Sequence, residues 1–153
     1  MNKAASTISK EERRSGPIVV GVDGSNASRR ALEWAVGEAE AHGNSVLAIS
    51  TYLIPTMATA VPGSDIQELA DRCQKILATE ISEASKGHSS VRIEAKVVEG
   101  PAAQVLIDAS KPASALVVGS RGHGGFVGLL LGSVSQQCVT HADCPVMVVR
   151  PVE

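Results

Sequence analysis

The chain has 153 residues, of which 44% are hydrophobic and 20% charged, and its formal net charge is −2. This length and balance are typical of a single globular domain with a sizeable core, and they exclude an intrinsically disordered chain. With only 2% aromatic residues, the chain lacks both the basic field and the stacking side chains that nucleic-acid binding requires. No apolar run reaches the roughly 18 residues of a membrane helix, so neither nucleic acid nor membrane is an expected partner.

The first residues and the cysteines indicate the compartment. Residues 1–15 are polar and carry no apolar segment of the kind found in secretory signals. We interpret them as a disordered tail before a single domain at 16–153. Cys73, Cys138 and Cys144 are sparse and odd in number, so a disulfide framework is not expected. These observations favour a cytoplasmic location.

Strands and helices alternate along the predicted domain. Short apolar, β-branched runs predict strands at 18–23, 45–51, 91–98, 113–119 and 146–149. Helical periodicity and turn signals predict helices at 27–42, 64–86, 102–110 and 133–141, the third with Pro101 at its first position. The strand at 91–98 begins with alternating apolar and polar residues, which favours a place nearer the sheet edge. Pro55, Pro62 and Gly63 predict a loop over 53–63, which could act as a lid.

This alternation predicts an α/β fold, an open five-stranded parallel sheet with helices on both faces. In such sheets ligands bind beyond the carboxyl ends of the strands. Three predicted turns reach that edge: the segments 23–25, 99–101 and 119–133. They can therefore converge on one site although they lie far apart in the sequence.

The segment from Gly119 to Ser133 carries the strongest functional signal. It follows a strand, contains glycines at 119, 122, 124, 125, 128 and 132, and ends where a helix is predicted to begin. Glycines let the backbone approach a ligand closely, and the free N–H groups of a helix start favour an anion. This order predicts a phosphate site, although glycines alone would also suit a turn that only connects strand and helix.

The glycine spacing distinguishes between phosphate motifs. No Gly-Lys-Ser/Thr ends the loop, so it is not a P-loop, and Val127 stands where the dinucleotide fingerprint needs its third glycine. Gly119-x-x-Gly122, nine residues, then Gly132-Ser133 resembles the ATP-binding subgroup of the universal stress protein family. The resemblance covers residues 17–151 and includes three further segments: Val-Gly-Val-Asp23-Gly-Ser, Val98-Glu-Gly100-Pro-Ala and Cys144-Pro-Val-Met-Val-Val-Arg150.

The resemblance implies a Rossmann-like sheet of the adenine nucleotide alpha hydrolase-like type, ATP as ligand, and roles in stress survival or growth control. It implies that Gly119, Gly122, Gly132 and Ser133 hold the phosphates and ribose. Asp23 would lie by the ribose or a phosphate-bound Mg²⁺, Thr51 would meet the adenine through its backbone, and Gly100 would let its turn pass close to the nucleotide. Family members are usually homodimers that pair through the last strand, which here starts at Val146 and ends at Arg150.

For several residues the sequence alone leaves more than one role open. Asp23 could cap the helix that follows it. Arg121 could neutralise phosphate charge or be a solvated loop residue. Cys138, His141 and Cys144 have close spacing, but a zinc site needs a fourth ligand and all of them on one side, so we expect no metal site there.

Three functions remain open at this point. The first is an ATP-binding, dimeric regulator that acts on an unknown protein partner and is not a fast enzyme. The second is a slow ATPase, although the loop offers no P-loop lysine and no evident base for water. The third is a dimeric interaction module whose loop is empty or binds another adenine nucleotide such as cyclic AMP.

Overall fold

The computed structural model describes residues 9–54, 66–122 and 130–152. Five parallel strands form one sheet in the order β3-β2-β1-β4-β5. They are β1 (Ile18–Gly21), β2 (Val46–Tyr52), β3 (Ile93–Glu99), β4 (Ala115–Gly119) and β5 (Val146–Val149). The predicted fold class is confirmed, and so is the place of the third strand at an edge.

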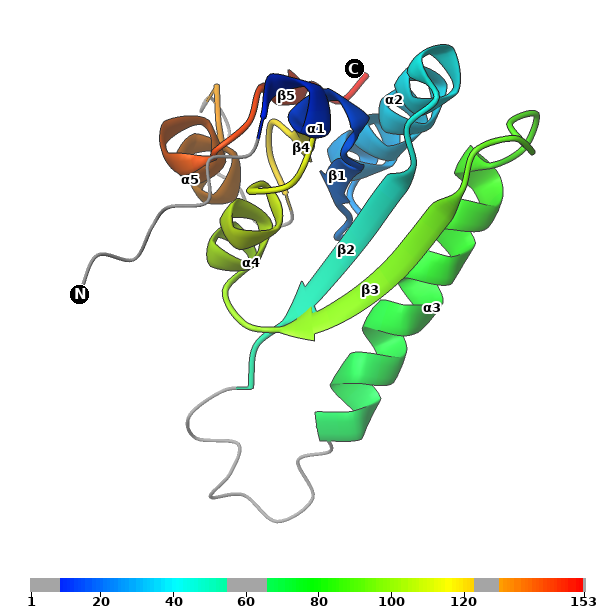
Figure 1. Ribbon diagram of the computed structural model, residues 1–153. Coiled ribbons are helices and arrows are strands. Elements are labelled where there is room, and N and C mark those ends of the chain that lie inside the picture. Colours follow the sequence, from blue (N-terminus) through cyan, green and yellow to red (C-terminus); the bar gives the residue numbers. More distant parts are fainter. Residues whose placement is uncertain (1–8, 55–65, 123–129, 153) are drawn as a thin grey trace.

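Two helices cover each face of the sheet (Figure 1). α2 (Asn26–His42) and α3 (Ile66–Ala84) pack on one face, and α4 (Ala102–Ala109) and α5 (Ser133–His141) pack on the other. The predicted ends are correct within about two residues, while the predicted start of the second helix at 64 lies outside the described residues. Pro101 is the N-cap of α4 and not its first helical residue, because its ψ of 126° is still extended. Most of the 53–63 loop lies outside the described residues.

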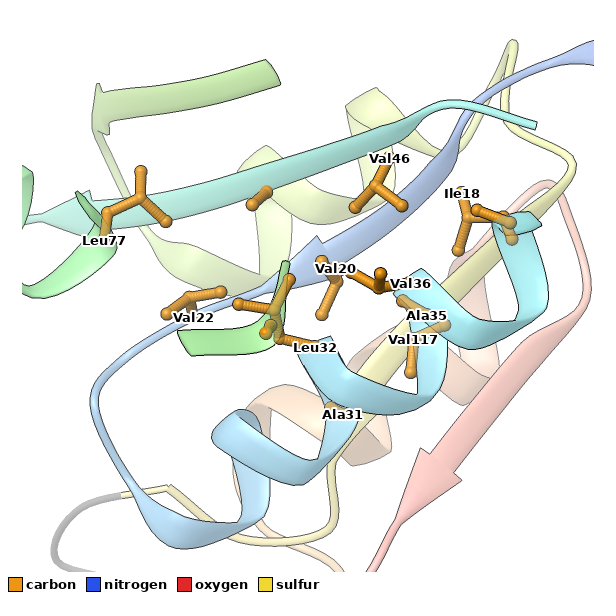
Figure 2. Packing of buried hydrophobic residues seen from close by; sticks show 13 residues of the cluster. Ile18, Val20, Val22, Ala31, Leu32, Ala35, Val36, Val46, Leu77 and Val117 are labelled. Carbon is orange, nitrogen blue, oxygen red and sulfur yellow. The ribbon is translucent and has the colours of Figure 1, made fainter. Parts of the chain in front are cut away.

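The side chains of β1 alternate between two hydrophobic cores, one on each face of the sheet. Val20 and Ile18 point to the α2 and α3 side, and Val19 points to the α4 and α5 side. All three are at most 2% exposed, as expected of a central parallel strand whose side chains alternate between two covered faces. Figure 2 shows Val20 against Leu32 and Val36 of α2. This packing fixes the place of β1, whose carboxyl end meets the site described below.

A short helix precedes β1. The predicted disordered tail is wrong for α1 (Lys10–Ser15), while residues 1–8 lie outside the described residues. Ser9 Oγ accepts from Glu12 N at 3.1 Å, and Ser9 N donates to the Glu12 carboxylate at 2.8 Å. This reciprocal capping box satisfies backbone donors that would otherwise need water. Hydrogen bonds to the carboxylate, first from the Ser9 backbone N–H and then from the Ser9 side chain, lower the pKa of Glu12. The sequence signal of the capping box is Ser9 followed three residues later by Glu12.

An ion pair with one buried partner joins α2 to α3. The Arg29 guanidinium donates to both carboxylate oxygens of Glu80, at 2.9 to 3.2 Å. Glu80 is buried and Arg29 is half-exposed. The carboxylate raises the pKa of Arg29, first through its hydrogen bonds and then through its charge. A buried carboxylate requires such a partner, so the pair fixes how the start of α2 meets α3.

The start of α2 depends on Ser25. Ser25 is the N-cap, and its side chain accepts from Ser28 N at 3.3 Å. We expect Ser25→Ala to lower the free energy of unfolding by about 1 kcal/mol, because one backbone donor of the first turn loses its partner. Ser25→Asn should lose much less, since asparagine is also a good N-cap. Urea denaturation of both variants tests this, and equal stability of Ser25→Ala and wild type would contradict it.

Candidate functional site

A cavity of about 600 Å³ lies at the carboxyl ends of β1, β2 and β4, beside the start of α5. This volume is within the range of about 300–1,000 Å³ that is usual for ligand pockets. All predicted site residues except Gly100 line it: Asp23, Thr51, Gly119, Arg121, Gly122, Gly132 and Ser133. The cavity therefore unites residues from four separate parts of the chain.

The strand order explains the position of the cavity. β1 has β2 on one side and β4 on the other, so the chain leaves β1 in one direction and later returns to pair on its opposite side. The helices after β1 and β4 consequently lie on opposite faces of the sheet. A crevice forms where such connections diverge, which is where open α/β sheets bind ligands.

Asp23 lies in a tight turn after β1. Its Oδ1 accepts from Ser25 N at 2.9 Å, and its own N donates to Ser28 Oγ at 3.2 Å. Gly24 has φ of 82°, a conformation that favours glycine. Asp23 is therefore not the N-cap of α2, which is Ser25. The turn holds the Asp23 carboxylate at the cavity wall, and its role toward a ligand stays a prediction.

The carboxylate of Asp23 reaches the glycine loop. A Cβ built on Gly122 would lie 2.5 Å from Asp23 Oδ2. A side chain at position 122 would therefore displace the carboxylate, whereas glycine leaves the two segments in contact. The end of β1 and the loop after β4 thus form one continuous wall.

The start of α5 opens into the cavity. Its N-cap is Gly132, for which no side-chain capping hydrogen bond is present. Ser133 and Val134, the first helical residues, line the cavity, and the first N–H groups of any α-helix have no intrahelical acceptor. Together with the helix dipole, these donors favour an anion. Arg121, half-buried in the same wall, adds positive charge.

The opposite part of the cavity is apolar. Val22, Ile49, Leu106 and Val118 line it. Gly21 allows the close approach of Leu106, since a Cβ on Gly21 would lie 2.9 Å from Leu106 Cδ1. The cavity therefore offers a hydrophobic wall at one end and backbone donors at the other.

Thr51 and Gly100 have different relations to the cavity. Thr51 at the end of β2 lines it. Gly100 N donates to Tyr52 O at 2.9 Å, and its φ of 144° favours glycine. Gly100 is not among the described lining residues, whereas Ala102 is. Gly100 thus lets the chain turn from β3 toward α4, and its closeness to a nucleotide stays a prediction.

Gly119 has a packing role that the motif does not reveal. A Cβ on Gly119 would lie 2.8 Å from Ala27 Cβ and 2.9 Å from both Ala27 C and Ser28 N. The first turn of α2 therefore rests directly on the end of β4. This contact brings the two cavity walls together.

The sequence model of the universal stress protein family matches residues 15–150. The chain belongs to the universal stress protein family. A universal stress protein of Mycolicibacterium smegmatis is 34% identical over 139 residues, covering 88% of this chain and 46% of that protein. The chain thus spans about half the length of the curated relatives that it matches.

Solved members of the family share the fold. The universal stress protein UspA from Lactobacillus plantarum superposes with a TM-score of 0.78 at 22% identity, covering 90% of this chain and 99% of that one. Another universal stress protein, solved in complex with cAMP, has a TM-score of 0.66 and 26% identity and covers 90% of this chain and 98% of that one.

The sequence of this universal stress protein did not indicate three polar residues of the cavity. Ser28, Ser135 and Gln136 line it beside the predicted residues. Ser25, which also lines the cavity, belongs to the predicted turn at 23–25, where its residue type already suited a helix cap. Ser135 and Gln136 carried no signal beyond their place in the first turn of the last helix.

Neither a metal-ligand cluster nor a membrane-spanning helix is present in the part of this family member that the structure describes. Within residues 9–54, 66–122 and 130–152, no three His, Cys, Asp or Glu side chains group as metal ligands. None of the helices built by these residues is long and apolar enough to cross a membrane.

Cys138 of α5 is completely buried in the core below the site. Burial raises the pKa of its thiol from 9.0 to about 11, with a smaller contribution from Cys144. The folded state therefore keeps the thiol proton at a pH where the unfolded chain releases it. Stability should fall as the pH rises above 9, by up to about 1.4 kcal/mol per unit until the folded pKa is reached.

We therefore expect urea denaturation at pH 8, 9 and 10 to give a steeper loss of stability for the wild type than for Cys138→Ala. Native Cys138 should also react with iodoacetamide only after unfolding, because the neutral thiol is a poor nucleophile. Mass spectrometry of the labelled peptides measures this. Rapid labelling of native Cys138 would contradict the burial on which both expectations depend.

Proposed function

We propose that this universal stress protein binds ATP together with Mg²⁺ in the cavity and acts as a nucleotide-dependent regulator of stress response or growth arrest. The observation that carries the proposal is the uncapped start of α5, which opens into the cavity beside Gly122 and Arg121. A polyphosphate is the anion that an extended row of backbone donors and a guanidinium suit best.

The residues present fit both ends of the nucleotide. The N–H groups of Ser133 and Val134 and the side chain of Arg121 would hold the phosphates. The apolar wall around Ile49 and Val118 suits the faces of an adenine ring. Asp23 would hold Mg²⁺, whose charge would offset repulsion between the carboxylate and the phosphates, since carboxylate and phosphate oxygens are preferred ligands of this ion.

A regulatory role fits the cavity better than rapid catalysis. Among the described lining residues there is no lysine or histidine, and Asp23 is the carboxylate available as a base. Phosphoryl transfer depends on a positioned nucleophile and dense positive charge. A regulator needs only that the nucleotide binds one of two states more tightly. A cytoplasmic protein partner would recognise that state.

The test is direct. Protein purified without added nucleotide is denatured, and its supernatant is compared by HPLC with ATP, ADP, AMP and cyclic AMP. We expect bound ATP, and titration calorimetry of emptied protein should show ATP binding that weakens without Mg²⁺. Protein that carries no nucleotide and binds none of the four would overturn the proposal. Recovery of ADP followed by rapid turnover of ATP would replace the regulator with an ATPase.

One observation favours a second ligand. A relative that is 26% identical was solved with cAMP. Cyclic AMP carries a single phosphate, so its binding would depend little on Mg²⁺ or on Asp23. Competition between ATP and cyclic AMP, with and without Mg²⁺, distinguishes these ligands.

We also propose a homodimer formed through β5. This strand lies at a sheet edge, and Met147 within it is 40% exposed. Its outer backbone groups can pair with another strand. Sedimentation of the wild type and of Val148→Pro tests the proposal, because proline removes a backbone donor from the strand. Val148→Pro should shift the protein to monomer, and a wild-type monomer would contradict the proposal.

A further inference from the structure

We infer that Ser135 is a positioning residue that holds the phosphate-binding end of α5 against the end of β4. The inference rests on the proposed function, because it concerns how the same cavity presents its backbone donors. Ser135 does not belong to the glycine spacing.

Ser135 connects the two ends of the glycine loop. Its Oγ lies 2.9 Å from Ser120 O and 3.0 Å from Gly132 O, so its single proton is shared between these two carbonyls. Gly132 N donates to the same Ser120 carbonyl at 2.6 Å. Ser120, where the loop begins, and Gly132, where it ends, are therefore joined through the carbonyl oxygen of Ser120 and the hydroxyl of Ser135.

The junction formed by Ser120, Gly132 and Ser135 is shielded from water and anchored to the sheet. Ser120 and Ser135 are each 2% exposed. Ser120 N donates to Val149 O of β5 at 2.8 Å, which fixes Ser120 in line with β4. Because water has little access, loss of the Ser135 hydroxyl cannot be compensated easily.

The start of α5 has few other constraints. Its N-cap is a glycine without a capping side chain, so no cap side chain holds the first turn. A small shift of this turn would misalign the N–H groups of Ser133 and Val134 with an anion, and hydrogen bonds weaken steeply with poor geometry. Ser135 thus supports phosphate binding by orienting these donors.

The test compares three variants. Ser135→Ala removes the hydroxyl. Ser135→Thr keeps the hydroxyl and adds a methyl group to a side chain that borders the cavity. The matched control is Ser110→Ala. Ser110 is fully buried, donates to Ile107 O at 2.6 Å and accepts from Asp143 N at 3.0 Å, but lies at the far end of α4.

Calorimetry with Mg²⁺ should show about fivefold to tenfold weaker ATP binding by Ser135→Ala, and less than about twofold weaker binding of adenosine. Ser135→Thr should bind ATP nearly as the wild type does, and Ser110→Ala should be unchanged although it is less stable. Unchanged ATP affinity in Ser135→Ala would overturn the inference. Equal losses for ATP and adenosine would also overturn it, because they would indicate a general loss of structure.

Amide hydrogen exchange tests the positioning without any nucleotide. The Gly132 amide should exchange about tenfold faster in Ser135→Ala than in Ser135→Thr or Ser110→Ala. Unchanged exchange would overturn the inference. Faster exchange in a protein that binds no nucleotide would support the positioning role and reject the proposed function, so the two failures can be distinguished.

Discussion

Replacing Gly132 by alanine is expected to weaken ATP binding by about 10- to 100-fold, with a loss of no more than about 1 kcal/mol in the free energy of unfolding. The φ of Gly132 is −76°, which alanine adopts readily. Its Cβ would lie 3.5 Å from Arg121 Cα and Ser120 O and 3.9 Å from Gly122 N. These are ordinary contacts, so the fold tolerates the methyl group.

Binding suffers because of where that methyl group lies. It would stand between the start of α5 and Gly122, where the proposed phosphate donors converge. Loss of one hydrogen bond to a charged group, at about 1.5–3 kcal/mol, accounts for the expected range. Calorimetry gives the affinity and urea denaturation the stability. Wild-type affinity in a Gly132→Ala protein would contradict this position for the phosphates.

Gly119→Ala, unlike Gly132→Ala, should strongly destabilise the fold. We expect a loss of about 3 kcal/mol in the free energy of unfolding. The added Cβ would lie 2.9 Å from Ala27 C and Ser28 N. These are backbone atoms of the first turn of α2, which cannot rotate away as a side-chain end can. The helix must therefore shift from the sheet or the strand end must distort.

Urea denaturation of Gly119→Ala measures this loss, and Gly132→Ala is the matched control because it adds the same methyl group at the other end of the loop. A Gly119→Ala protein as stable as Gly132→Ala would show that α2 does not rest on β4 in this way. Together the two variants separate the packing role of the motif from its binding role.

The sequence was sufficient to predict which segments would gather at one edge of the sheet. Asp23, Thr51, Gly119 and Gly122 lie at or just after the ends of parallel strands, whose carboxyl ends share one edge, so their convergence could be expected. Their presence around one cavity agrees with this expectation. Gly100 differs, because its backbone turns the chain toward α4 and leaves Ala102 at the cavity.

Other parts of the site could not be predicted from the pattern. Ser135 appeared as one polar residue in a short helix, and its contacts with Ser120 depend on how the loop closes. Gly119 matched a binding motif, yet its tight contact is with Ala27. Neither contact is between neighbours in the chain, so no local pattern encodes it.

The sequence by itself determined the five strands, the four helices that cover the sheet, the α/β class and the family, because hydrophobic period, turn residues and motif spacing are local properties of the chain. Only the tertiary structure decided that β1 lies between β2 and β4, which residues border the cavity, and which glycine serves packing. These depend on contacts between segments distant in sequence, whose geometry is set when both faces of the sheet are covered and its core is close-packed.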